Sequence, residues 1–268
     1  DEHGDDHGEA VPLDRYAAFT AGLSQEEIDR AIANQENWII EQILARDPNG
    51  PGREVLEPVI KVGIQRSVRS GEGNGGHGHS GLSPWQPIED PQVRATLATQ
   101  IEQARAAAVA LPTAADAMAA GYYQSTQYLS GIGAHYVNPG YILDGVLDPG
   151  KPEILLYGGN GPDAPVVGVS YLVAAPEDRA PEGFAGPNDV WHFHEGLCYR
   201  GGLTVPVGGS DVQPANCAAI GGELRRGING QQLWMMHAWV VPGWDSPWGL
   251  FSSEHPGLTL ALGEQYPG

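Results

Sequence analysis

Lysine is nearly absent from this sequence, in which Lys61 and Lys151 are the only two among 268 residues. Lysine and arginine together number 14, against 33 acidic residues, which gives a formal net charge of −19. Binding to nucleic acid or to an anionic membrane surface depends on clustered basic side chains, and the sequence contains no such cluster. We therefore expect no nucleic-acid partner.

Long apolar runs and the common catalytic motifs are also missing. The chain has no uninterrupted apolar run of about 18 residues, the length that a membrane-spanning helix needs, so no transmembrane span is predicted. It contains no Gly-x-Ser-x-Gly elbow, no phosphate-binding loop ending in Gly-Lys-Ser/Thr and no His-Glu-x-x-His helix. Any chemistry must therefore come from another arrangement of side chains.

Cysteine occurs only twice, as Cys198 and Cys217. The polar segment that starts at Asp1 is typical of the residues that follow a removed export signal or lipid anchor, so we expect an extracytoplasmic protein, periplasmic or secreted. In that setting the two cysteines are expected to form a disulfide across a glycine-rich segment. The alternative is that Cys198, four residues after His194, is a thiolate metal ligand.

The 38 glycines and 22 prolines predict a loop-rich chain, and 41% hydrophobic residues still permit a core. Helical periodicity and capping signals predict helices over residues 24–46, 52–69, from Asp90-Pro91 onward, and from Thr113 to about Gly121. Apolar runs predict strands over 153–157, 166–173, 191–199 and 233–241, with the first two forming a hairpin. The fold class is therefore α+β: a helical N-terminal half followed by an antiparallel β-sheet or small barrel.

Composition divides the chain into four parts. Residues 1–20 form an acidic, histidine-containing tail, 21–70 a helical segment, and 71–89 a Gly/His-rich linker. Residues 90–268 form a helix plus antiparallel β domain with the candidate metal site. The tail and linker also carry His3, His7, His77 and His79, which are typical of weak metal collection or of a solvated segment.

The histidines of the predicted strands give the strongest functional signal. In Trp191-His192-Phe193-His194-Glu195 the alternation of side chains places His192 and His194 on one face of a strand, where two imidazoles can converge on one ion. His237 lies in the middle of a strand, and a buried neutral histidine there needs a partner. His135 lies in a glycine-rich turn between the helices and the sheet.

Two carboxylates complete the candidate set. Glu153 opens an apolar strand and is expected to meet a metal or a cation, whereas Glu195 is expected on the opposite face from the histidine pair.

His255, which precedes Pro256, is expected at the surface. The tryptophans Trp234, Trp239, Trp244 and Trp248 are expected to pack the core or, alternatively, to form a ligand platform.

Several segments resemble those of a group of exported bacterial proteins without established activity. They include Gly133-Ala134-His135-Tyr136-Val137-Asn138-Pro139, Lys151-Pro152-Glu153-Ile154-Leu155-Leu156-Tyr157, the stretch from Trp191 to Cys198, and Met236-His237-Ala238-Trp239-Val240-Val241-Pro242-Gly243. The resemblance spans roughly residues 90–260 and implies that His135, Glu153, His192, His194 and His237 belong together. The His-x-His strand is also similar to the metal-binding pattern of cupins, although the later glutamate of that pattern is missing.

These observations predict an exported metalloprotein that binds copper or zinc, with iron or manganese as further options. The expected ligands are His192, His194 and His237, with His135 and Glu153 as the next candidates. One alternative is a metal-dependent oxygenase or hydrolase that uses a metal-bound water. A second is a metal-free envelope module whose tryptophans meet a ligand. Oligomeric state does not follow from the sequence.

Overall fold

The structure, a computed structural model, describes residues 14–70, 85–142, 145–194, 196–206 and 214–268. The predictions made for His3, His7, His77, His79 and Glu195 lie outside the described residues.

Eight helices occur in the described residues, and the four predicted ones are among them, with ends that differ from the prediction by at most two residues. Ser24 caps α2 through a reciprocal capping box with Glu27, Asp90 caps α4, and Thr113 caps α5 through a second box with Asp116. The helices are α1 (Arg15–Phe19), α2 (Gln25–Arg46), α3 (Arg53–Ser70), α4 (Pro91–Val109), α5 (Ala114–Ala119), α6 (Pro139–Ile142), α7 (Pro214–Ala219) and α8 (Leu260–Gln265).

The described strands form two antiparallel sheets. The larger has six strands in the order β1-β2-β3-β4-β9-β5, and the smaller has the order β7-β6-β8. The strands are β1 (Tyr123–Gln124), β2 (Ala134–Val137), β3 (Ile154–Tyr157), β4 (Val166–Ala175), β5 (His192–Phe193), β6 (Leu197–Arg200), β7 (Leu203–Thr204), β8 (Glu223–Arg225) and β9 (Gln232–Ala238). Neither sheet closes, so the α+β prediction is confirmed but its barrel variant is wrong.

The predicted hairpin is present as β3 and β4, which pair antiparallel. The predicted single strand over 191–199 is wrong, because the chain changes sheets within it. His192–Phe193 pairs with β9 in the larger sheet, whereas Leu197–Arg200 pairs with β7 and β8 in the smaller one. The apolar segment 191–199 therefore contributes one short strand to each of the two sheets.

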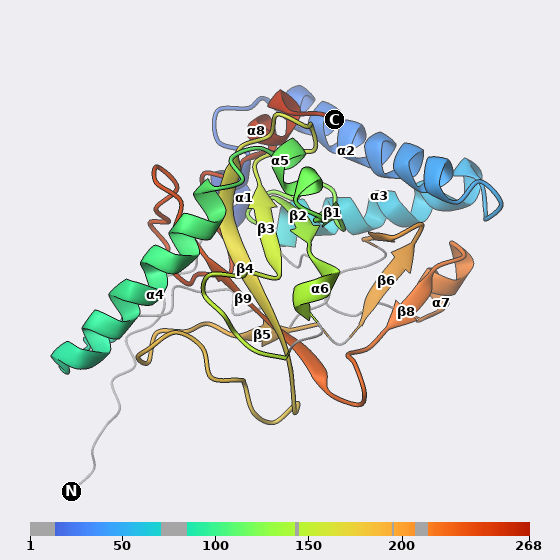
Figure 1. Ribbon diagram of the computed structural model, residues 1–268. Helices are drawn as coiled ribbons and strands as arrows, with labels where there is room; N and C mark the ends of the chain where they lie inside the picture. The colour runs from blue at the N-terminus through green and yellow to red at the C-terminus, as the bar shows by residue number, and fades with distance from the viewer. Residues whose placement is uncertain (1–13, 71–84, 143–144, 195, 207–213) are drawn as a thin grey trace, which may run out of the picture.

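Two hydrophobic clusters hold these elements together. The first joins α4 and α5 to the six-stranded sheet, and its fully buried members include Tyr157, Tyr171 and Trp239. The second joins α2 and α3 to the smaller sheet and α7. Figure 1 shows α2 and α3 side by side and α4 apart from them along the larger sheet. The N-terminal helices thus bury their apolar faces against segments that come more than 100 residues later in the sequence.

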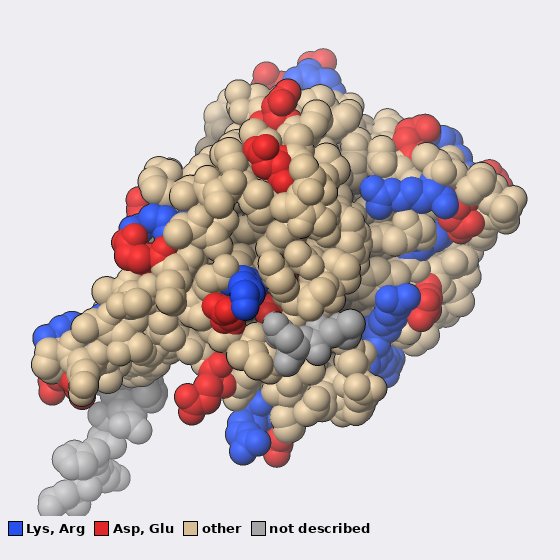
Figure 2. Space-filling view, in the orientation of Figure 1, with Lys and Arg blue, Asp and Glu red and all other residues tan. Residues whose placement is uncertain are grey.

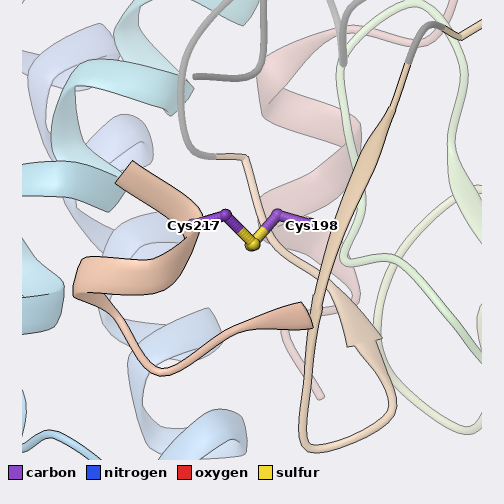
Figure 3. Close-up of a disulfide and its surroundings, with 2 residues drawn as sticks. All are labelled: Cys198 and Cys217. Carbon is purple, nitrogen blue, oxygen red and sulfur yellow. A yellow bond between two sulfur atoms is a disulfide. The ribbon is translucent and has the colours of Figure 1, made fainter. Parts of the chain in front are cut away.

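Cys198 and Cys217 form the predicted disulfide, which ties β6 to α7 (Figure 3). Both cysteines are buried in the second cluster. A Cβ atom on Gly222 would lie 2.6 Å from the Cys198 sulfur, so only glycine fits beside the bond. The alternative of Cys198 as a thiolate metal ligand is wrong, because its sulfur is already bonded.

The surface agrees with the charge balance of the sequence. Figure 2 shows the lysine and arginine side chains dispersed over the visible face, several of them beside an acidic side chain. Among the described residues, Arg53 forms an ion pair with Glu41, and Lys151 forms one with Asp148. No helix of the described residues is long and apolar enough to cross a membrane.

Candidate functional site

Four histidines from separate segments meet on one face of the six-stranded sheet. His135 comes from β2, His237 from β9, His192 from β5, and His194 follows directly after β5. In the sheet order, β3 and β4 lie between β2 and β9, so a flat sheet would hold His135 and His237 about 14 Å apart at the backbone. Their rings are nevertheless in contact, which means that the sheet curls and the side chains lean toward each other over its concave face.

The rings of these four residues, which we call the histidine cluster, are closely spaced. Ring centroids are 5.3 Å apart for His192 and His237, 5.5 Å for His192 and His194, and 5.7 Å for His135 and His237. The pKa values of both His135 and His237 also respond to the charge of His194. By the strand register, Met235 also lies on this face, opposite His192.

Burial keeps the inner members of the cluster neutral. His135 and His237 are 6% and 2% exposed. Burial lowers the pKa of His135 to about 3, with smaller contributions from His237 and His194. Burial likewise lowers the pKa of His237 to about 4, against the opposing effect of the Ser253 carbonyl. Both imidazoles are therefore uncharged at neutral pH, the form in which histidine binds metals.

The hydrogen bonds of His237 determine which of its ring nitrogens carries the proton. Its Nδ1 lies 2.7 Å from the Ser253 carbonyl oxygen, which only accepts, so Nδ1 donates and Nε2 keeps its lone pair. Nε2 is buried and has no hydrogen-bond partner. A carbonyl that fixes the outer nitrogen and leaves the inner one available is the usual arrangement of a metal-binding histidine. The His135 Nδ1 is 3.1 Å from the Thr126 hydroxyl, which orients that ring.

His255 is buried, so the expectation of a surface position is wrong. It is 6% exposed, and its ring packs between Trp239 and Trp244. Its Nδ1 accepts a hydrogen bond from the Gly257 amide, which places the proton on Nε2. The lone pair of His255 is thus already used, in contrast to that of His237.

Glu153 lies on the other side of the sheet from the cluster. It is 1% exposed, and its carboxylate accepts a hydrogen bond from the Leu172 amide. Burial raises the pKa values of Tyr122 and Tyr171, and the charge of Glu153 adds to both increases, which places Glu153 near those two rings. Tyr171 and His237 lie on opposite faces of the paired strands β4 and β9. The structure therefore brings His135, His192, His194 and His237 together and separates Glu153 from them.

As they stand, no three or more His, Cys, Asp or Glu side chains in the described part of the chain are arranged so that they could hold a metal ion. The rings of the histidine cluster have to turn toward a common point before they can bind one metal ion together. No family model, curated protein or solved structure matches this chain.

A cleft that the sequence did not reveal lies along the segment leading into β5. It measures about 890 Å³ and is lined mainly by residues 175–191, among them Phe184, Asp189 and Trp191. The Oδ1 atom of Asp189 is buried without a hydrogen-bond partner. Burial raises the pKa of Asp189 to about 7, outweighing the opposing effects of the Phe184 backbone and the Trp191 indole. A single aspartate in a Pro/Gly-rich segment gives no signal in the sequence.

We expect Asp189 to make the stability of the protein depend on pH. Its pKa is higher in the folded chain than its ordinary value of 3.8, so its contribution to stability is complete below pH 4 and is lost as the pH rises through 7. With allowance for the partial exposure of the side chain, the free energy of unfolding decreases by about 2 kcal/mol. Urea unfolding at pH 5 and pH 8 should show this decrease for the natural protein relative to Asp189→Asn. Equal decreases in both proteins would contradict the assignment.

Proposed function

We propose that this protein binds one transition metal ion, copper or zinc, through His192, His194 and His237, with His135 as the fourth ligand. The observation that carries the proposal is the buried His237 Nε2, which has no hydrogen-bond partner and belongs to a ring that lies within 6 Å of two further histidine rings. A buried polar atom without a partner costs about 1–3 kcal/mol, which a bound ion would offset.

The spacing of the rings supports the proposal. With a metal–nitrogen bond of about 2.0–2.1 Å and tetrahedral angles, two imidazole centroids bound to one zinc ion lie about 5.2 Å apart. The observed separations of 5.3, 5.5 and 5.7 Å are close to that value. The three pairs link His194, His192, His237 and His135 in a row, so binding of one ion requires the rings to turn toward a common point. Neutral imidazole suits both copper and zinc.

The location of the protein belongs to the same proposal. A disulfide between Cys198 and Cys217 is typical of an oxidising compartment, which supports a periplasmic or secreted protein. The net charge of −19 attracts cations to the surface without selecting among them. Under this proposal the protein handles metal outside the cytoplasm, and the histidines of the tail and linker add weaker binding.

Metal content tests the proposal directly. We would express the protein so that it is exported from the cytoplasm and remove residues 1–11. Elemental analysis would then compare it with the His192→Ala/His194→Ala variant. We expect close to one equivalent of a single transition metal in the natural protein and almost none in the variant. A His77→Ala/His79→Ala variant serves as the control and should retain the metal.

Two outcomes would decide against the proposal. If neither the isolated protein nor protein supplied with copper, zinc or iron holds metal, the metal-free envelope module becomes the preferred function. If metal is present but is lost only from the His77→Ala/His79→Ala control, the ion belongs to the linker and the histidine cluster is structural.

A further inference from the structure

The cleft along the segment leading into β5 lies on the opposite face of the six-stranded sheet from the histidine cluster. Phe184 of its lining packs against Tyr171, which faces away from His237, and Gln100 of its lining belongs to α4. A volume of about 890 Å³ is within the range of small-molecule sites. The proposed metal site therefore does not account for this cleft.

One carboxylate of the cleft wall lacks a partner. The side chain of Asp189 is half-buried and lines the cleft, and its Oδ1 atom is buried without a hydrogen-bond partner. Gly183 makes room for it, because a Cβ atom on that residue would overlap the Asp189 Oδ2 and lie 3.0 Å from the Trp191 Nε1. The carboxylate and the indole are thus held together over a residue that has to be glycine.

The charges around Asp189 indicate which kind of ligand would pair with it. Arg179 and Glu182 are the other charged side chains of the lining, so the wall carries more negative than positive groups. The pKa of Asp189 responds to burial, the Phe184 backbone and the Trp191 indole, and no charged group in the described part of the chain contributes. Arg179 therefore does not neutralise this carboxylate, and a partly buried carboxylate is costly to ionise unless a cation pairs with it.

Much of the remaining wall is apolar. Alanine and proline side chains of residues 175–187 form most of it, together with Phe184. Apolar groups of a ligand gain free energy when they leave water for such a surface. The cleft thus combines one unpaired carboxylate with walls that suit a hydrocarbon group.

We propose that this cleft binds a small organic cation, an ammonium group on an apolar body, and that the Asp189 carboxylate forms an ion pair with the ammonium group. An N–H of the ammonium donates the charge-assisted hydrogen bond that the Asp189 Oδ1 lacks, and the apolar body packs against the alanine, proline and Phe184 side chains. A neutral hydroxyl would leave the charge of the carboxylate unpaired, and an anion would be repelled by it.

Calorimetric titration with benzylammonium and hexylammonium tests this inference, with benzyl alcohol and hexanol as neutral counterparts of similar shape. We expect both amines to bind the natural protein more tightly than the alcohols do. Asp189→Asn should bind the amines about 10-fold or more weakly, because the charge is lost while the shape of the side chain is kept. Asp163→Asn is the matched control: it removes one negative charge from an exposed position outside the cleft and should leave amine binding unchanged.

The pH dependence of binding gives a second measurement, which a purely structural role of Asp189 would not affect. The pKa of Asp189 is about 7, so most of its carboxylate is ionised at pH 8 and little of it at pH 5.5, whereas both amines stay protonated. We expect amine binding to the natural protein to weaken about 10-fold or more from pH 8 to pH 5.5. Binding to Asp189→Asn should be weak at both pH values.

Three outcomes would overturn the inference. If Asp189→Asn binds the amines as tightly as the natural protein, the ion pair with Asp189 is refuted. If the alcohols bind as tightly as the amines, the cleft selects apolar molecules and not cations. If neither amine binds at millimolar concentration, the cleft is not a site for organic cations. Urea unfolding of Asp189→Asn shows whether that variant is folded, and metal content is measured separately, so failure here leaves the proposed metal site untouched.

Discussion

Replacing His237 by alanine should abolish the stabilisation of this protein by a transition metal ion. His237 is the histidine whose Nε2 lone pair is both buried and unused, and its Nδ1 is held by the Ser253 carbonyl. Loss of an outer hydrogen-bond partner already weakens metal sites 10–100-fold, so loss of the ligand itself should lower the affinity by more than about 100-fold. At a metal concentration 100 times the dissociation constant, the natural protein gains about 2.7 kcal/mol and the variant gains almost nothing.

Thermal unfolding with and without zinc measures this difference. For a chain of this size the gain corresponds to an increase in the melting temperature of about 5–10 °C. His255→Ala is a matched control, because His255 is also buried but its lone pair accepts a hydrogen bond from the Gly257 amide. We expect that variant to be less stable in the absence of metal and to keep the full metal-dependent increase. Loss of the increase in both variants would indicate a general packing defect and not a ligand.

Removing the disulfide should destabilise the protein by about 3 kcal/mol. Cys198 and Cys217 are 19 residues apart in the sequence, and a loop of that length loses roughly this much conformational freedom in the unfolded chain when it is closed. The bond also lies inside the cluster that joins α2 and α3 to the smaller sheet. Its loss should therefore weaken this part of the molecule first.

Urea unfolding of the Cys198→Ala/Cys217→Ala variant tests this expectation. The midpoint should fall, and circular dichroism should show that loss of the helical signal precedes loss of metal binding. The reason is that the strand neighbours of the histidines, such as Tyr136 and Trp239, belong to the other hydrophobic cluster. The natural protein, treated with reductant, provides the control without substitutions. A decrease in the free energy of unfolding of less than about 1 kcal/mol would show that the unfolded chain gains little conformational freedom when this loop is opened.

The sequence predicted the local structure well because local signals determine it. Ser24 and Thr113 form capping boxes that any helix beginning there would use, and Leu56, Ile60 and Ile64 repeat at the helical period and are all fully buried. The alternation in Trp191-His192-Phe193-His194 likewise indicated that His192 and His194 share one side. The disulfide followed from the presence of only two cysteines. Each of these inferences depends on residues close together in the chain or, for the disulfide, on the single pairing that two cysteines allow.

The errors concern relationships between distant segments. Glu153 has the chemistry of a ligand, but which face it occupies depends on where β3 joins the sheet, and that placement sends it toward Leu172 and Tyr171. His255 looked exposed because Pro256 follows it, yet Trp239 and Trp244 enclose it. The strand predicted over 191–199 belongs to two sheets because its two halves pair with different, distant partners.

By itself, the sequence determined the helices, the hairpin, the disulfide and the set of histidines from which a site is drawn. The tertiary structure alone decided which histidines meet, because His135 and His237 are brought together by the order and curl of four strands. It also decided that the His237 Nε2 is available whereas the lone pair of His255 is used, since those hydrogen bonds come from Ser253 and Gly257 in one folded loop.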